Sequence, residues 1–289
     1  MEKFLAALLA GITDGAAIGL VALGFVIVYK ATRILNFGQA EIGTLAIYVE
    51  ANLVGLGIPV LFAIILALGV AGLLGAATER LFRPLAQAPR LTVTVATLGI
   101  STILIAFQIL RFKIDPRTAP ELISGNLFTL ANFDVRYGRI LALLVTIALG
   151  AALYTFFKRS LFGLGVLAVA QDQTALRLQG LPLNRVSAFV WAAGAMVCAL
   201  AGMIIAPTIG SFTPGFMTLT LVASALAAGL VGGLTSLPGA FVGGMAIGIT
   251  QNIAKFYLED LAGAEFLAVF GAMILVLLVK PNGLLGAEA

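Results

Sequence analysis

The residues of this chain that could do chemistry are few, and the densest group of them lies within residues 36–41. Asn36, Gln39 and Glu41 place two amides and a carboxylate at the start of an apolar segment. A carboxylate among apolar side chains is costly unless it meets water, a cation or a hydrogen-bond donor. Glu41 could therefore belong to a solute pathway or its gate. It could instead be a structural charge that is favoured near a helix N-terminus and pairs with Arg33.

Polar or helix-breaking residues interrupt the apolar segments at two further places, Asp14 and residues 232–240. Asp14 lies inside the first apolar run, where a carboxylate is a candidate for function unless the helix begins close to it and leaves it at an interface. Residues 232–240 contain too much glycine and proline for a continuous helix, so a tight turn is expected there. Ser236 and Pro238 either only shape that turn or line a pathway, because broken backbone at membrane depth is tolerated where it faces a wet cavity.

A mixed segment, 158–185, separates two apolar runs. Its middle, 168–179, has the pattern of a short amphipathic helix that Gly180 and Pro182 end. The polar residues of this helix include Gln171, Asp172 and Arg177. We interpret the helix as a docking surface for a partner protein; the alternative is a simple connection between two spans.

Several kinds of chemistry have no residues to support them. The chain contains no histidine and a single cysteine, Cys198, so the commonest metal ligand and general base are absent and no intrachain disulfide can form. The sequence contains no Gly-x-x-x-x-Gly-Lys-Ser/Thr loop for phosphate, no His-Glu-x-x-His metal motif and no Gly-x-Ser-x-Gly nucleophile motif. We therefore expect no metal site and no enzyme activity, and any ATP that drives the protein should be hydrolysed by another polypeptide.

The composition requires lipid as the solvent for most of the chain. Of 289 residues, 61% are hydrophobic and 10% are charged, whereas a soluble domain carries about 25% charged residues. Mean hydropathy is +1.11. The net charge of +4 comes from bases that lie singly or in pairs between apolar runs, which is typical of the positive-inside bias and not of nucleic-acid binding.

The hydrophobic runs predict an all-α integral membrane protein, a bundle of about eight or nine transmembrane helices in one permease domain over residues 1–289. The expected spans are 5–28, 37–53, 58–78, 91–110, 140–157, 186–206, 219–233, 240–254 and 265–279. The first run is longer than the apolar part of a signal peptide, so we interpret it as a retained span. The bases Arg80, Arg83 and Arg90 in one short loop indicate the cytoplasmic side, which would also hold 158–185 as a coupling loop.

Glycine is spaced along two of the expected spans. Gly11, Gly15 and Gly19 recur every four residues on one face, and Gly239 and Gly243 do the same later in the chain. Such stripes let helix backbones approach closely in lipid. They predict tight packing within the chain or contact with a second membrane subunit.

Four segments together resemble one known family. Residues 35–41, 79–84, 232–244 and 280–286 are similar to the LivH-type permeases, which are membrane subunits of branched-chain amino acid ABC importers. The likeness covers nearly the whole chain, with the segments in the expected order. This sequence has Gln39 and Ala40 where the family often has His and Gly, and Asp14 has no counterpart in the family pattern.

The resemblance implies a set of partners and a place in the cell. It implies a second, LivM-like permease subunit, two cytoplasmic ATPase subunits that hold ATP and Mg, and an extracytoplasmic solute-binding protein. It also implies that this chain is a multi-pass subunit in the lipid bilayer of the bacterial inner membrane. It also implies a cytoplasmic coupling helix in the cleft of an ATPase subunit. The positions assigned to that helix are Ala168, Gln171, Asp172, Ala175, Arg177 and Gly180. Gln171 stands where the family often has an acidic residue.

The function implied is import of branched-chain or related amino acids by alternating access, with the binding protein docking near 111–139 and 207–216. Related permeases for urea, short amides or other small organic solutes remain an alternative. A second alternative is a secondary carrier driven by Na⁺ or H⁺, for which Asp14 and Glu41 are the candidate ion sites within the spans.

Overall fold

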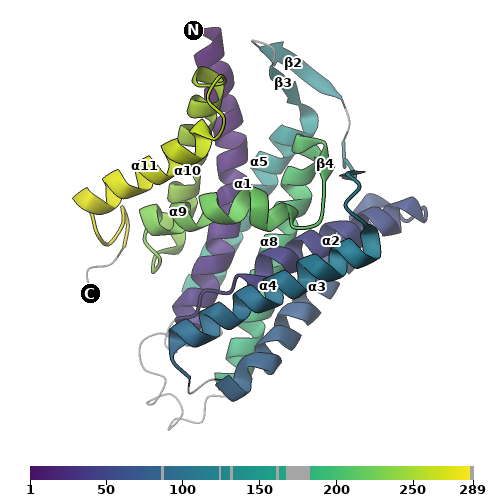
Figure 1. Ribbon diagram of the computed structural model, residues 1–289, viewed down its shortest axis with the longest axis vertical. Helices are drawn as coiled ribbons and strands as arrows, with labels where there is room; N and C mark the ends of the chain where they lie inside the picture. Colours follow the sequence, from purple (N-terminus) through teal and green to yellow (C-terminus); the bar gives the residue numbers. More distant parts are fainter. Residues whose placement is uncertain (86–87, 124, 131–132, 161–162, 167–182, 287–289) are drawn as a thin grey trace.

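The computed structural model describes residues 1–85, 88–123, 125–130, 133–160, 163–166 and 183–286 (Figure 1). Besides the four helical residues 163–166, this part of the chain contains nine α-helices. They are α1 (Glu2–Thr32), α2 (Gly38–Gly55), α3 (Val60–Phe82), α4 (Arg90–Phe112), α5 (Tyr137–Arg159), α8 (Leu183–Ile209), α9 (Ala223–Gly232), α10 (Leu237–Tyr257) and α11 (Ala264–Val279). A 3-10 turn, η1 (Arg83–Leu85), follows α3, and a π-helical segment, η2 (Thr218–Val222), runs directly into α9.

Five of the described helices are long and apolar enough to cross a membrane. They are α1, α3 with η1, α4, α5 and α8. Two shorter apolar helices, Thr218–Gly232 and Ala264–Val279, accompany them. Polar side chains such as Glu41 and Gln251 lower the hydropathy of the other two, α2 and α10. Each predicted span lies in one of these helical segments, so the expected all-α membrane fold is confirmed.

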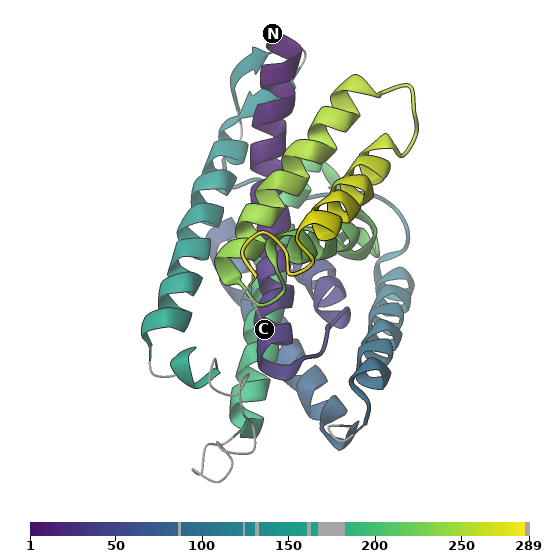
Figure 2. The same cartoon turned by 90° about the vertical axis from the view of Figure 1, so that its left-hand side faces the viewer.

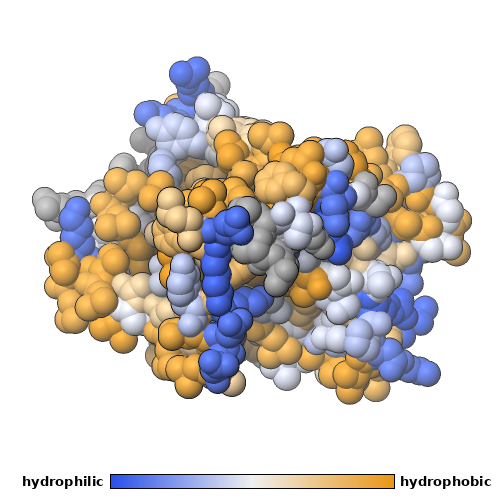
Figure 3. All heavy atoms as spheres, turned by 90° about the horizontal axis from the view of Figure 1, so that it is seen from above, coloured by the Kyte–Doolittle hydropathy of each residue, from blue (hydrophilic) through white to orange (hydrophobic). Residues whose placement is uncertain are grey.

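The helices are arranged in an interior and an outer layer. Most of α1 is buried and α8 is largely so, whereas α3, α4 and α5 are mostly exposed. Figure 2 shows α5 on one side of α1 and the pair α10 and α11 on the other. Large apolar side chains cover the exposed helices, among them Leu73, Ile103, Leu144 and Leu278. These apolar faces suit a lipid environment, and hydrophobic residues dominate the outline of the molecule seen from the end that carries the N-terminus (Figure 3).

The two ends of the bundle differ in charge and in structure. At one end, where α1 and α3 finish and α4 and α8 begin, lie Lys30, Arg33, Arg83 and Arg90 (Figure 1). We call it the basic end. The opposite end carries the N-terminus and a β-hairpin, and we call it the hairpin end.

The glycines of α1 bring this helix into backbone contact with α10. A Cβ at Gly15 would lie 2.9 Å from the carbonyl oxygen of Gly244, and one at Gly11 would lie 2.6 Å from the Cα of Ile249. A Cβ at Gly248 would in turn collide with the Cα of Gly15. The stripe of α1 therefore packs within the chain, antiparallel to α10.

The later glycine stripe has a different neighbour. A Cβ at Gly239 would collide with the carbonyl oxygen of Gly232, and one at Gly243 would collide with the carbonyl oxygen of Ala228. Both contacts close the turn between α9 and α10. Gly239 and Gly243 thus hold α10 against α9, while Gly244 faces α1 on the adjoining side of the same helix.

The segment that follows α11 closes over this turn. Leu284 N donates to Val231 O (2.7 Å), and Leu285 N donates to Gly232 O (3.1 Å). These bonds satisfy carbonyls at the end of α9 that have no partner within the helix. Two of the segments that carry the family resemblance, 232–244 and 280–286, therefore pack on each other.

Short strands at the hairpin end were not expected from the sequence. β1 (Arg117–Thr118) pairs antiparallel with β4 (Ser211–Phe212), and β2 (Asn126–Leu130) pairs with β3 (Phe133–Arg136). The ring of Phe212 packs edge-on against Tyr48 of α2 at 4.7 Å. The two segments named above for docking of a binding protein are thus neighbours at this end.

Candidate functional site

The carboxylate of Glu41 lies fully buried where α2, α4 and η2 meet. Its Oε1 accepts a hydrogen bond from Thr218 N (3.1 Å), and its Oε2 accepts one from Gln108 Nε2 (3.1 Å). Among the described residues no ion pair joins Glu41 to Arg33, so that expectation is wrong. Two helix N-termini favour this carboxylate: Glu41 lies in the first turn of α2, and its Oε1 also accepts from the start of the helical segment that contains η2.

Two neighbours of Glu41 bind the same broken segment. Thr44 Oγ1 accepts from Met217 N (3.1 Å), and Gln108 Oε1 accepts from Gly215 N (3.2 Å). Gly215 has φ of +81°, which only glycine adopts without strain. We call Glu41, Thr44 and Gln108 the cradle, because together they satisfy backbone N–H groups that an irregular helix start leaves open.

The segment η2, which the cradle holds, is a π-helix. Such turns are rare and are often found at functional sites. Leu219, inside η2, is 70% exposed although its neighbours Leu221 and Val222 are buried. The cradle therefore holds a non-standard piece of helix at the surface of the described bundle.

The amides of Asn36 and Gln39 behave differently from the cradle. Both side chains are fully buried, yet their amide nitrogen and oxygen atoms have no hydrogen-bond partner among the described residues. The indole Nε1 of Trp191 is likewise buried without a hydrogen-bond partner among the described residues. A Cβ at Gly194 would lie 2.6 Å from Val28 Cγ2 and 3.0 Å from the oxygen of Gln39, so a larger residue there would press on both side chains. An unsatisfied buried polar group costs about 1–3 kcal/mol, and each such group needs an explanation.

The turn before α2 is held by α4. Thr97 Oγ1 accepts a hydrogen bond from Phe37 N (3.1 Å) and donates one to Leu35 O (3.1 Å). Thr97 and Gln108 thus fix both the approach to α2 and the carboxylate of Glu41 in its first turn. The structure brings Asn36, Gln39 and Glu41 together on one buried stretch, as the sequence indicated.

Ser236 and Pro238 have local contacts at the start of α10. Ser236 Oγ accepts from Gly239 N (3.1 Å) as the N-cap, and proline occupies the first turn. These are ordinary ways to begin a helix. The contacts of both residues are those of the tight turn, and a pathway role for them stays a prediction.

Asp14 takes part in a second polar cluster that sequence reasoning missed. Helix α1 begins at Glu2, so the alternative of a helix start beside Asp14 is wrong. Its Oδ1 lies 3.4 Å from Arg139 Nη1, and its Oδ2 accepts from Asn252 Nδ2 (3.2 Å). Arg139 also donates to Thr208 O (3.2 Å), so the cluster joins α1, α5, α8 and α10. The sequence did contain a signal for this cluster: Arg139 stands at the edge of one expected span, and Asp14 is a lone acid inside another.

We expect Asp14→Ala to lower the free energy of unfolding by about 1–3 kcal/mol, because it removes the Asp14 carboxylate from the Arg139 guanidinium and from the amide of Asn252. This loss in free energy of unfolding is smaller than for a fully buried ion pair, because 29% of the Asp14 side chain is exposed to solvent that screens the charges. Thermal unfolding in detergent measures the effect. Asp260→Ala, at an exposed turn, is the matched control, and equal unfolding midpoints for the two variants would contradict the assignment.

The basic end contains contacts made by the first residues described after the expected coupling helix. Ala168, Gln171, Asp172, Ala175, Arg177 and Gly180 lie outside the described residues. Just beyond them, Asn184 O accepts from Arg83 Nη2 (3.2 Å), and the same guanidinium pairs with Glu79 at 2.8 Å. The segment 79–84 of the family resemblance therefore reaches the first turn of α8. A polar cavity of about 400 Å³ opens beside this pair, with Trp191 in its lining.

The described fold defines a class: a multi-pass helical membrane protein that buries polar side chains of α2 in its interior. No group of three or more His, Cys, Asp or Glu within the described ranges could hold a metal ion. The particular family follows from comparison with known proteins. Residues 7–278 match the family described as the permease component of branched-chain amino acid transport systems, and the chain belongs to that family.

Similar proteins of this family come from bacteria and archaea. The chain is 30% identical to the LivH permease of Escherichia coli over 301 residues, covering 98% of this chain and 96% of that one. It is 28% identical to BraD of Pseudomonas aeruginosa with the same coverage, and 28% identical to a probable LivH of Methanocaldococcus jannaschii over 93% of this chain and 88% of that one. These relatives are transport permeases, so the expectation of a transport subunit that is not an enzyme is confirmed.

Proposed function

We propose that this chain is a membrane subunit of an ATP-driven importer for branched-chain or closely related amino acids in a bacterial inner membrane. The observation that carries the proposal is the match of residues 7–278 to the permease family, with relatives of that specificity aligned end to end. Import then needs a second, LivM-like permease, two ATPase subunits that bind ATP and Mg, and a solute-binding protein at the hairpin end.

The orphaned amides and the cradle support alternating access through movement of α2. In this conformation, Asn36, Gln39 and Trp191 hold polar groups that have no hydrogen-bond partner within the part of the chain that the structure describes. Such groups gain hydrogen bonds in a conformation that admits water or solute, which biases the equilibrium between the two states. Glu41 ties the same helix to η2 through Thr218, so a shift of α2 is transmitted to the broken segment.

The contacts of the two acids weigh against an ion-coupled carrier. Both oxygens of Glu41 accept N–H donors, and Asp14 is paired with Arg139. An ion site needs carboxylate oxygens that a cation or proton can reach in one of the states. Here donors and a fixed guanidinium already occupy them.

The coupling assignment is tested by a double variant, Asp172→Ala with Arg177→Ala. We expect loss of co-purification with the ATPase subunits and loss of uptake, because the coupling helix is where the ATPase makes its differential contacts. The matched control is Lys3→Ala with Glu259→Ala, which removes one positive and one negative charge from an exposed surface pair. Association and uptake at the wild-type level in the first variant would refute the assignment.

The class of transporter is tested by reconstitution of the purified chain in sealed vesicles. Concentrative leucine uptake should require the partner permease, the ATPase subunits and ATP. Uptake that follows a proton or sodium gradient with the chain alone would replace the proposal by the carrier alternative.

A further inference from the structure

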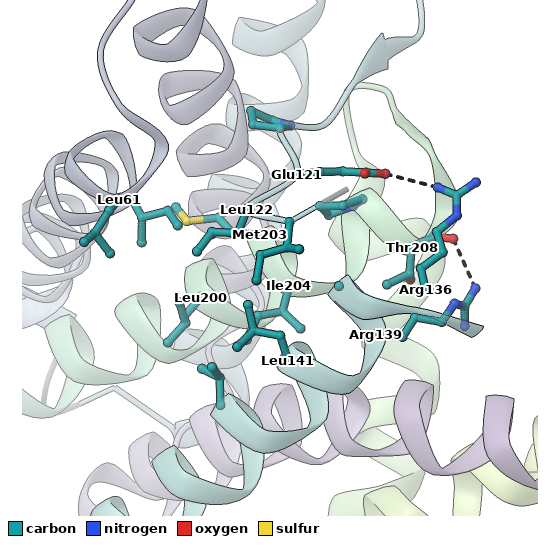
Figure 4. A pocket seen from close by; sticks show the side chains of 16 residues that line it. Leu61, Glu121, Leu122, Arg136, Arg139, Leu141, Leu200, Met203, Ile204 and Thr208 are labelled. Atoms are coloured by element: carbon teal, nitrogen blue, oxygen red, sulfur yellow. Dashed lines mark hydrogen bonds and ion pairs between the residues drawn. The ribbon is translucent and has the colours of Figure 1, made fainter. Parts of the chain in front are cut away.

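A cavity of about 220 Å³ lies between α3, α5 and α8 near the hairpin end, below residues 120–123 (Figure 4). Apolar side chains form its walls, among them Leu61 of α3, Leu141 of α5, and Leu200, Met203 and Ile204 of α8. An apolar chamber of this kind accepts a hydrocarbon group without the cost of burying polar atoms.

Charged groups stand at one side of the chamber only. Glu121 Oε1 lies 3.1 Å from Arg136 Nη1, and about a third or more of each side chain is exposed. Figure 4 shows this pair and Arg139, which donates to Thr208 O, on the side away from Leu61 and Leu200. The rim thus offers one carboxylate and one guanidinium that reach solvent and cancel each other in charge.

The depth of the chamber fits within one leaflet of a bilayer and spans somewhat more than half of it. Arg139 and Val145 line it from the same helix, six residues apart, which is roughly 9 Å along the axis at 1.5 Å per residue. One leaflet contributes about 15 Å of hydrocarbon, half of a core of about 30 Å. With the rim charges at the level of the headgroups, the apolar walls lie at the level of the upper acyl chain.

The chamber is continuous with the lipid-facing flank of the protein. Leu61 is 59% exposed and Leu122 is 52% exposed, and both line the cavity. The neighbouring surfaces of α3 and α5 are also apolar and exposed. A molecule can therefore enter sideways from the bilayer without leaving a hydrocarbon environment.

From these observations we propose that the cavity binds one glycerophospholipid of the leaflet at the hairpin end. Part of an acyl chain fills the chamber, and the headgroup rests on the pair Glu121–Arg136. Arg136 binds the phosphate, and Glu121 accepts from a primary ammonium. The exposed pair Glu121–Arg136 carries no net charge, and the third charged group of the lining, Arg139, is mostly buried and paired with Asp14. The rim therefore favours a zwitterionic headgroup of the phosphatidylethanolamine kind over an anionic one. This binding goes beyond the proposed import function and does not depend on it.

A soluble branched-chain amino acid presents the same zwitterion and an apolar group, and it is the rival occupant. The open flank of the chamber faces lipid, and an amino acid would have to expose its charges there. Charged groups are expensive in hydrocarbon. The lateral opening therefore favours the lipid.

The chamber is tested with the intact chain in a mild detergent, to which palmitoyl-oleoyl phosphatidylethanolamine is added before native mass spectrometry. Leu141→Trp fills the chamber and should lower the bound fraction about tenfold, the effect of about two methylene groups losing their burial. Ile147→Trp, on the exposed face of the same helix outside the cavity, should bind lipid as the wild type does. Thermal unfolding shows that the variants are folded, and Met203→Trp replaces Leu141→Trp if that variant is not.

The headgroup is tested by the double variant Glu121→Gln with Arg136→Gln. It should bind phosphatidylethanolamine and phosphatidylcholine equally, whereas the wild type should prefer the former. Equal lipid binding by the wild type and a folded chamber-filling variant would overturn the proposal. So would binding of radiolabelled leucine to the lipid-free chain that Leu141→Trp abolishes. Neither measurement involves transport, so failure here leaves the proposed function untouched.

Discussion

Replacement of Glu41 by alanine is expected to abolish uptake and to lower the free energy of unfolding by about 3 kcal/mol. The variant leaves Thr218 N without its acceptor and removes one of the two acceptors of Gln108 Nε2, which keeps the backbone carbonyl of residue 41 (3.2 Å); an orphaned donor costs about 1–3 kcal/mol. The first residues of η2 then lose the group that fixes them to α2. Uptake in cells and the thermal unfolding midpoint in detergent measure the two effects.

Glu41→Gln separates charge from shape. Its carbonyl oxygen can still accept from Thr218 N, but its amide nitrogen faces the amide nitrogen of Gln108, so we expect an intermediate loss. Glu259→Ala is the control, because its carboxylate is 68% exposed in a surface pair with Lys3 and contributes little. Wild-type uptake and stability in Glu41→Ala would show that the cradle has no role.

Gly248→Ala is expected to prevent the helices α1 and α10 from closing, with a loss of about 3 kcal/mol or more and little folded protein. The added Cβ would collide with the Cα of Gly15, and its next neighbours are also backbone atoms of α1. No side-chain rotation can relieve such a contact. Gel filtration of a fluorescent fusion measures the folded fraction.

Gly99→Ala on α4 supplies the comparison, since a Cβ there meets no atom within 4 Å. Alanine has the higher helix propensity, so this variant should be neutral or slightly stabilised. If both variants fold equally well, the close approach of α1 and α10 is not required.

Hydrophobic runs were enough to place the helices, because each span has to satisfy its backbone bonds within its own segment. The polar group around Glu41 was also recognisable, since an acid in an apolar run is rare enough to stand out. The hydrogen-bond partners of Glu41 could not be recognised from the sequence. Gln108 lies 67 residues from Glu41 and Thr218 lies 177 residues away, and nothing local in the sequence links them.

The Asp14 cluster and the small strands show the same limit in different ways. Asp14 and Asn252 are 238 residues apart, and their contact depends on the tight packing of α1 on α10. β1 and β4 have two residues each, which is too short for the alternation that identifies a strand. Tertiary placement creates both features, so local pattern could not predict them.

The bonds from Leu284 and Leu285 to the end of α9 have a consequence for biogenesis. The ribosome makes α9 and α10 well before the stretch that completes their connection. During synthesis, the carbonyl groups of Val231 and Gly232 therefore need other hydrogen-bond donors, in the translocon or at the lipid interface, until Leu284 and Leu285 are made. Maturation of this corner is therefore a late event, which follows membrane insertion of α11.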